Sequence, residues 1–156
     1  MSLRLESSAV FATTTEDAYD TLVDAPLEAL FTSRSGPISP VARCEGQVGD
    51  WGTTGQTRRV VLTDGSSNLE TLVGADRADL DYRYLLSDFQ GPFRMLVRTI
   101  DGRFAFAPEG GGTRVTWTWV MHPTNPVAGR LLPVVGMFWR RWAAAMWPRF
   151  GDRLPT

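Results

Sequence analysis

A long apolar stretch near the C-terminus, residues 125–154, constrains the fold more than any other part of the chain. Asn125 followed by Pro126 is typical of a helix N-cap and first helical position, and apolar residues then recur about every 3.6 residues. The spacing predicts one long C-terminal helix, in which Pro133 introduces a kink or a break near residues 129–133. Its predicted apolar face consists of Val127, Leu131, Val134, Val135, Phe138, Trp142, Ala145 and Met146.

The opposite face of this helix carries arginines together with two aromatic side chains that the pattern leaves without a partner. We place Trp139 and Trp147 there, near Arg130, Arg140 and Arg141. An exposed aromatic and basic face is typical of a surface that binds another protein, a second copy of the chain or a membrane. A homodimer and a membrane-surface protein are therefore alternatives that the helix alone leaves open.

The region before the helix contains strand-like segments that supply the apolar partner it needs. Turn signals, among them Asp64-Gly65 and the glycine-rich residues 109–112, separate these segments. The last segment alternates in polarity, and we assign its tryptophan face, with Trp117 and Trp119, to the interior against the helix. The predicted strands are residues 3–12, Val41–Gln47, Gly55–Thr63, Asn68–Ala75, Asp79–Leu86, Met95–Phe106 and Thr113–His122.

Two short helices are predicted after the first strand. One begins at Thr14, whose spacing to Asp17 is that of a capping box, and the other spans Pro26–Phe31. Their acidic side chains repel phosphates, which favours packing over DNA recognition. The order of elements predicts an α+β fold, in which a curved antiparallel sheet of about seven strands surrounds the long C-terminal helix. Because one helix cannot cover so wide a sheet, we expect a cavity with apolar walls between them.

Composition excludes several functional classes. At 156 residues the chain is expected to form a single domain over residues 1–156. Its net charge of −1 and the lack of a basic tract argue against nucleic acid as a partner, and the absence of lysine excludes Schiff-base chemistry. Cys44 is the only cysteine and His122 the only histidine, so an intramolecular disulfide is impossible and no metal or cofactor is expected.

No apolar stretch reaches the length of about eighteen residues that a transmembrane helix requires. The first residues also lack the apolar core of a signal peptide. We therefore expect a soluble, cytoplasmic protein without an integral membrane segment. We interpret Cys44 as a small hydrophobic side chain and His122 as a solvated strand end rather than as catalytic groups.

Four pieces of the sequence, taken in order, resemble the helix-grip superfamily. They are TTTEDAYDTL, then GQTRRVVLTDG followed by NLETLVGAD, then DYRYLL, and last GGGTRVTWTWVMHP leading into the terminal helix. This superfamily (SRPBCC) includes Bet v 1-like proteins, START lipid-transfer domains and a polyketide cyclase/dehydrase-like branch, which the chain resembles over nearly its whole length. The resemblance implies an incomplete barrel around the C-terminal helix, with an interior cavity for an apolar or amphipathic small molecule. Many such proteins only bind a ligand, and some cyclise or dehydrate polyketides.

One pair of residues is carried over from this resemblance. In plant hormone receptors of the superfamily, an arginine and a glutamate on the two strands of a hairpin point into the cavity, and Arg58 and Glu70 match their positions. Arg58 shares a strand face with Val60, so it lies in line with apolar residues. The pair is either a structural ion pair or a polar anchor with acid–base capacity. The receptors' gate motifs are not matched by SDFQGPF, so hormone sensing is not implied.

The leading hypothesis is binding of a small hydrophobic or amphipathic ligand, such as a lipid, a polyketide or an aromatic molecule. The alternative is a polyketide cyclase or dehydrase, in which Arg58 would steady an enolate oxygen and Glu70 or Tyr82 would move the proton. Trp51, Phe89 and Phe93 either cover an edge of the core or form the mouth of the cavity. The predicted ligand-binding residues are Arg58, Val60, Glu70, Tyr82, Tyr84, Trp117, Trp119, Leu131, Val135, Phe138 and Trp142.

Overall fold

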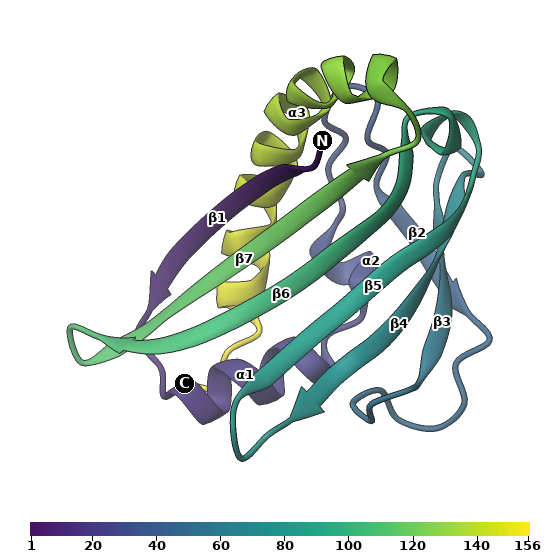
Figure 1. Cartoon of the computed structure of the whole chain (residues 1–156). Helices are drawn as coiled ribbons and strands as arrows, with labels where there is room; N and C mark the ends of the chain where they lie inside the picture. Colours follow the sequence, from purple (N-terminus) through teal and green to yellow (C-terminus); the bar gives the residue numbers. More distant parts are fainter.

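A computed structural model describes all residues, 1–156, and shows a seven-stranded antiparallel sheet that curves around a long helix (Figure 1). The strands lie in the order β1-β7-β6-β5-β4-β3-β2, so β1 and β2 form the two edges. The strands are β1 (Leu3–Phe11), β2 (Val41–Glu45), β3 (Thr57–Leu62), β4 (Ser67–Asp76), β5 (Asp81–Gln90), β6 (Val97–Glu109) and β7 (Gly112–Pro123). The helices are α1 (Thr15–Asp24), α2 (Leu27–Leu30), the 3-10 helix η1 (Pro92–Met95) and α3 (Pro126–Asp152).

The predicted α+β architecture is confirmed, and its strands differ from the prediction mainly at their ends. The segment SDFQGPF lies between the predicted strands Asp79–Leu86 and Met95–Phe106, but β5 continues to Gln90 and η1 begins at Pro92. The assignment of the β7 tryptophan face to the interior is also confirmed, because Trp117 and Trp119 are both buried. Alternation with a period of two leaves a strand with one buried face little freedom, so this face follows directly from the sequence.

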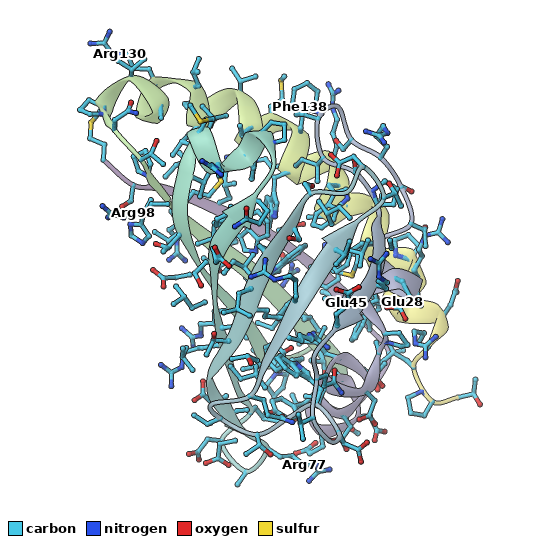
Figure 2. The ribbon with its side chains drawn as sticks, turned by 90° about the vertical axis from the view of Figure 1, so that its right-hand side faces the viewer. Glu28, Glu45, Arg77, Arg98, Arg130 and Phe138 are labelled. Atoms are coloured by element: carbon cyan, nitrogen blue, oxygen red, sulfur yellow. The ribbon has the colours of Figure 1, made fainter.

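Helix α3 begins with the predicted cap, in which the Asn125 side chain accepts a hydrogen bond of 2.8 Å from the backbone N–H of Ala128. It continues without interruption through Pro133 and Pro148, so a break near residues 129–133 is wrong. Figures 1 and 2 show the helix curving instead, as it passes over the end of the sheet. Proline removes one backbone hydrogen bond from the helix, which favours such a bend.

The face that α3 buries differs from the prediction. Trp139 and Trp147, which were assigned to the outer face, are 0% and 6% exposed and pack in the core. Leu131 and Val134, which were assigned to the inner face, are 49% and 53% exposed. The predicted outer aromatic surface therefore does not exist, and an aliphatic one takes its place.

A close contact at Gly136 accounts for this orientation of the helix. A Cβ atom there would lie 2.8 Å from Cδ2 of Leu5 in β1, so glycine lets the helix and the strand approach each other closely. Because the first half of α3 is apolar on most sides, a period of about 3.6 residues fits two orientations. The contact between Gly136 and Leu5 selects the orientation that buries Trp139.

Helix α3 lies along the β1–β7 side of the sheet, α1 lies at one end of the sheet, and α2 lies between α3 and β2 (Figure 1). The Trp147 indole N–H donates a 2.9 Å hydrogen bond to Ser7 Oγ of β1 and anchors the second half of the helix. The Tyr19 hydroxyl donates a 2.9 Å hydrogen bond to the backbone oxygen of Asp81, which joins α1 to β5. The concave face over β3 to β6 is therefore left open to a cavity.

Candidate functional site: an apolar cavity under the C-terminal helix

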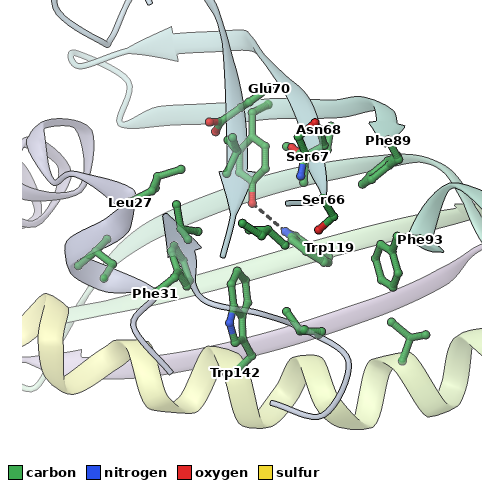
Figure 3. A pocket seen from close by; sticks show the side chains of 18 of the residues that line it. Leu27, Phe31, Ser66, Ser67, Asn68, Glu70, Phe89, Phe93, Trp119 and Trp142 are labelled. Carbon is green, nitrogen blue, oxygen red and sulfur yellow. Dashed lines mark hydrogen bonds between the residues drawn. The ribbon is translucent and has the colours of Figure 1, made fainter. Parts of the chain in front are cut away.

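A cavity of about 270 Å³ lies between the sheet, α3 and the segment that contains α2. Of its 27 lining residues, 19 are hydrophobic, so the wall favours an apolar occupant. Figure 3 shows Trp142 of α3 on one side, Trp119 of β7 on another, and Phe31 between α2 and β2. The Phe31 and Trp142 rings stack with their centroids 4.3 Å apart, which forms a flat aromatic wall.

The lining residues that reach solvent gather at one end of the cavity. Asp64 and Ser66 belong to the turn between β3 and β4, whereas Gln90, Pro92 and Phe93 belong to the end of β5 and to η1. Figure 3 shows Ser66 and Phe93 on the same side of the cavity. The mouth therefore lies between the β3–β4 turn and η1. Phe93 is one of its residues, which agrees with the interpretation of Phe93 as part of the cavity mouth rather than as a cover for an edge of the core.

Tyr84 occupies the centre of the sheet wall and is held by two tryptophans. Its hydroxyl oxygen accepts hydrogen bonds from the indole N–H groups of Trp117, at 2.7 Å, and Trp119, at 2.8 Å. Gly102 lies opposite both Tyr84 and Trp119 in the sheet register, and a Cβ at this position would overlap the tyrosine ring. The phenol has two acceptor sites, so both are used and its own O–H remains to donate.

Burial raises the pKa of Tyr84, and the negative charge of Glu70 raises it further, although the two indole donors oppose these effects. The pKa of Tyr82 is likewise raised by burial and by Glu70. Both phenols are therefore neutral at physiological pH and act as hydrogen-bond donors or acceptors. Neither is available as a phenolate base without first losing a tightly held proton.

Replacing Gly102 with alanine tests the arrangement around Tyr84. The new methyl group would push the tyrosine ring away from its two tryptophan partners, which is a case of overpacking. We expect the free energy of unfolding to fall by about 1–3 kcal/mol. Chemical denaturation measures this loss in the free energy of unfolding. Gly110→Ala cannot serve as a matched control, because Gly110 has a positive φ of 57°, a conformation that disfavours alanine. Ala105→Gly on the same strand is a better comparison, and a larger loss there would contradict the proposed crowding.

Arg58 and Glu70 form a buried ion pair across the β3–β4 hairpin. Arg58 Nε donates a 2.7 Å hydrogen bond to Glu70 Oε1, and each side chain is 5% exposed. The guanidinium also lies 3.8 Å from the ring centroid of Trp51, whose indole N–H donates a 2.9 Å hydrogen bond to the Tyr82 hydroxyl. Trp51 therefore covers an edge of the core rather than forming the cavity mouth. These contacts satisfy the charges in a site that water barely reaches.

The two members of this pair differ in their access to the cavity. Glu70 lines the cavity, whereas Arg58 lies behind it against Trp51. Burial raises the pKa of Glu70, and the positive charge of Arg58 only partly offsets this effect. Burial acts to lower the pKa of Arg58, but the charge and hydrogen bond of Glu70 outweigh it and raise that pKa. Glu70 is thus the one group of the pair that can meet a ligand.

Eight of the eleven predicted ligand-binding residues line the cavity, and three do not. Arg58 lies behind Glu70, Leu131 faces outward on α3, and the Phe138 ring packs over Gly36, where a Cβ would overlap it. Leu131 and Phe138 were predicted to line the cavity because the periodicity placed a different face of α3 against the sheet. The residues that do line the cavity are Val60, Glu70, Tyr82, Tyr84, Trp117, Trp119, Val135 and Trp142.

Two important wall residues were not predicted from the sequence. Phe104 of β6 stacks on Trp117, with a centroid distance of 5.2 Å and an interplanar angle of 9°. It lies two residues after Gly102 on the same strand face, and that alternation was a usable signal. Phe31 was assigned only to helix packing, and nothing local indicates that its ring reaches Trp142 from a distant segment.

Two buried polar atoms in cavity-lining residues have no hydrogen-bond partner. They are the indole N–H of Trp142, a donor, and Oδ1 of Asn68, an acceptor. Figure 3 shows Asn68 next to Ser67 near the mouth and Trp142 on the opposite side. Buried polar atoms are rarely left unpaired in folded proteins, because each loses its hydration without compensation. A ligand with matching polar groups would satisfy them.

Other candidate groups lie outside the cavity. His122 Nε2 lies 2.8 Å from Asp101 Oδ2, and His122 Nδ1 lies 2.8 Å from Ser2 Oγ, but Ser2 and Asp101 are exposed and none of the three lines the cavity. Cys44 is half-buried, and burial raises the pKa of its thiol to about 11, so it is neutral at physiological pH.

No group of three or more His, Cys, Asp or Glu side chains is arranged to hold a metal ion. None of the helices combines the length and apolarity needed to cross a bilayer.

Comparisons with solved structures show the same fold. Ginseng major latex-like protein 151 from Panax ginseng is 13% identical and aligns with a TM-score of 0.70 over 99% of both chains. The protein TTHA0849 from Thermus thermophilus is 20% identical and aligns with a TM-score of 0.65, covering 97% of this chain and 96% of that one. Ara h 8.0201 is 15% identical, with a TM-score of 0.63 over 93% of this chain and 98% of that one. At these identities the likeness establishes the fold alone.

The sequence itself gives the family. No curated protein sequence matches the chain significantly. The family described as polyketide cyclase / dehydrase and lipid transport matches residues 2–154, which is nearly the whole length. This match agrees with the seven-stranded sheet, the long C-terminal helix and the cavity between them. The chain belongs to the polyketide cyclase / dehydrase and lipid transport family of the helix-grip superfamily.

Proposed function

We propose that the cavity binds a small, mostly apolar molecule that carries one or two polar groups. The observation that carries this proposal is an apolar cavity whose wall holds the unpaired indole N–H of Trp142. Four buried polar side-chain atoms lack a hydrogen-bond partner, and those of Trp142 and Asn68 are the two that belong to cavity-lining residues. The cavity's volume of about 270 Å³ lies near the lower end of ligand pockets, which run from about 300 to 1,000 Å³.

The wall determines what kind of ligand fits. Contact with the aromatic rings supplies affinity of about 25 cal/mol per Å² of apolar surface buried, before the entropic cost of binding is subtracted. The Trp142 N–H and the Tyr84 O–H are both donors, so they favour a carbonyl, ether or hydroxyl oxygen on the ligand. Asn68 Oδ1 near the mouth favours a hydroxyl or amine donor at the other end.

A primary alcohol of medium chain length is a suitable first ligand, because it combines an alkyl chain with one oxygen. We expect saturable binding by calorimetry, and we expect Val60→Trp, which fills part of the cavity, to weaken it by about tenfold or more. Val73→Trp is the matched control, since Val73 lies on the outer face of the sheet and is 44% exposed. Equal binding by both variants would place the alcohol outside the cavity and refute the proposal.

An enzymatic role in the same cavity is the second candidate, and Glu70 is the observation that favours it. Its carboxyl group lines the cavity, and burial raises its pKa towards the range useful for proton transfer. In a cyclase or dehydrase, Glu70 would move the proton while the Tyr84 O–H stabilised an enolate oxygen. Arg58 would then act by positioning Glu70 rather than by touching the substrate.

Glu70→Gln separates the two candidates. The amide keeps the shape of the side chain but cannot transfer a proton, so cyclisation of a poly-β-ketone substrate should fall by about 100-fold or more. Binding of the alcohol should change little, provided that the variant folds. Cyclisation that is unchanged in the variant would remove Glu70 from the mechanism, and no turnover of this substrate by the wild-type protein would contradict the cyclase role.

A further inference from the structure

The first half of α3 exposes a row of aliphatic side chains that no part of the chain covers. Val127, Leu131, Val134 and Met137 are 69%, 49%, 53% and 46% exposed, although they belong to a helix whose other side forms the core. Met95 of η1, which is 69% exposed, belongs to the same region. Single exposed apolar residues need no explanation, but several neighbouring ones indicate an interaction surface.

Helix η1 is fastened to the start of α3. The Thr124 backbone N–H donates a hydrogen bond of 3.1 Å to the Leu96 oxygen, and the Thr124 hydroxyl donates one of 2.7 Å to the Met95 oxygen. Figure 1 shows η1 beside the first turns of α3, and Figure 2 shows Arg130 at the outer end of the molecule. We call this region the end surface, formed by Met95, Val127, Leu131, Val134 and Met137.

The charged side chains of η1 and α3 that lie beside the end surface have one sign. Helix η1 and α3 up to Gly151 contain no aspartate or glutamate. They carry five exposed arginines that form no ion pair within the chain, namely Arg94, Arg130, Arg140, Arg141 and Arg149. On the sheet, by contrast, several exposed arginines pair with a nearby carboxylate. The free guanidinium groups around the end surface fit an anionic partner.

We propose that the end surface binds the surface of a lipid bilayer that contains anionic headgroups. Aliphatic side chains flanked by arginines match the interfacial region, where acyl chains meet phosphates. A second copy of the chain fits less well, because a two-fold contact through this surface would oppose arginines of the same charge without an acidic partner. Phe93 and Leu96, next to Met95, line the cavity mouth, so an apolar ligand has a short path from a bilayer. This last point rests on the proposed ligand binding.

Vesicle flotation tests the proposal with the full chain. We expect binding to vesicles of phosphatidylcholine with phosphatidylserine, little binding to phosphatidylcholine alone, and release as salt rises. Leu131→Ser with Val134→Ser, and separately Arg94→Gln with Arg130→Gln, should each lower the partition by about tenfold or more. Val73→Ser and Arg103→Gln are matched exposed controls on the sheet and should float like the wild-type protein.

Three outcomes would overturn the bilayer proposal. They are no binding to anionic vesicles, equal losses in the control variants, or a dimer in sedimentation equilibrium that Leu131→Ser dissociates while vesicle binding is absent. The alcohol titration on the same variants keeps this test separate from the proposed function. None of the four substituted residues lines the cavity, so ligand binding should persist where vesicle binding is lost.

Discussion

Replacing Arg58 with leucine is expected to lower the free energy of unfolding by about 3–5 kcal/mol, since it leaves the Glu70 carboxylate buried without a counter-charge. Both side chains of the pair are 5% exposed, so water cannot take over the role of the guanidinium. The substitution also removes the cation that lies 3.8 Å above the Trp51 ring. Urea unfolding at neutral pH measures the loss directly.

Two further variants show whether the buried charge is the cause. Arg59→Leu removes a neighbouring arginine whose partner Asp88 is largely exposed, and it should cost about 1 kcal/mol or less. The double variant Arg58→Leu with Glu70→Leu removes both charges, so it should recover much of the stability lost in Arg58→Leu. A double variant that is no more stable than Arg58→Leu would show that packing, rather than an unpaired carboxylate, dominates the loss.

The stability of Arg58→Leu should also depend on pH in a particular direction. Burial raises the pKa of Glu70 in the folded chain, and without Arg58 nothing offsets that effect. The folded variant then binds a proton more tightly than the unfolded chain, so its free energy of unfolding rises as the pH is lowered from neutral towards acid. The difference in free energy of unfolding between Arg58→Leu and the double variant Arg58→Leu with Glu70→Leu should therefore narrow in mild acid. A difference that does not change with pH would show that Glu70 is not the titrating group.

Replacing Trp139 with alanine is the second large change, with an expected loss of about 3–5 kcal/mol in the free energy of unfolding. Trp139 is 0% exposed, and its ring centroid lies 4.9 Å from that of Trp117 and 5.4 Å from that of Trp119. The substitution removes a fully buried ring at the point where α3 meets the sheet. The same denaturation experiment applies, and the loss should appear in the denaturant midpoint.

Leu131→Ala is the matched comparison on the same helix, because alanine also replaces an apolar side chain there without disturbing the helical backbone. Leu131 is 49% exposed, so its loss should cost less than about 1 kcal/mol. The periodicity of the sequence alone predicts the reverse order, with Leu131 inside and Trp139 outside. A larger loss for Leu131→Ala than for Trp139→Ala would therefore restore the sequence-based orientation of α3.

The strands could be predicted from the sequence more reliably than the orientation of the helix. Alternation along β7 allows only two faces, and the tryptophans of one face decide between them. The first half of α3 is apolar on most sides. One side packs on the core, and another forms an exposed aliphatic surface. The deciding contact, Gly136 against Leu5, joins residues far apart in the chain and leaves no periodic signal.

The candidate site could be predicted in part for the same reason. Strand alternation indicated Tyr84 and Trp119 as residues of the cavity wall, whereas Glu70 was indicated by the resemblance to the helix-grip superfamily. The use of Trp51 as a cover for Arg58 could not be read from the sequence, because it depends on how a glycine-rich loop folds back over β3. The stacking of Phe31 on Trp142 likewise depends on tertiary structure alone.

A crystal structure with a bromine-labelled primary alcohol of medium chain length tests ligand binding in the cavity most directly. Anomalous scattering locates the bromine atom without reference to the protein map. Binding in the cavity places the bromine among Trp142, Trp119 and Phe31, with the alcohol oxygen within hydrogen-bond distance of the Tyr84 hydroxyl or the Trp142 N–H. An empty or collapsed cavity, with bromine absent or only on the outer side of α3, would contradict it.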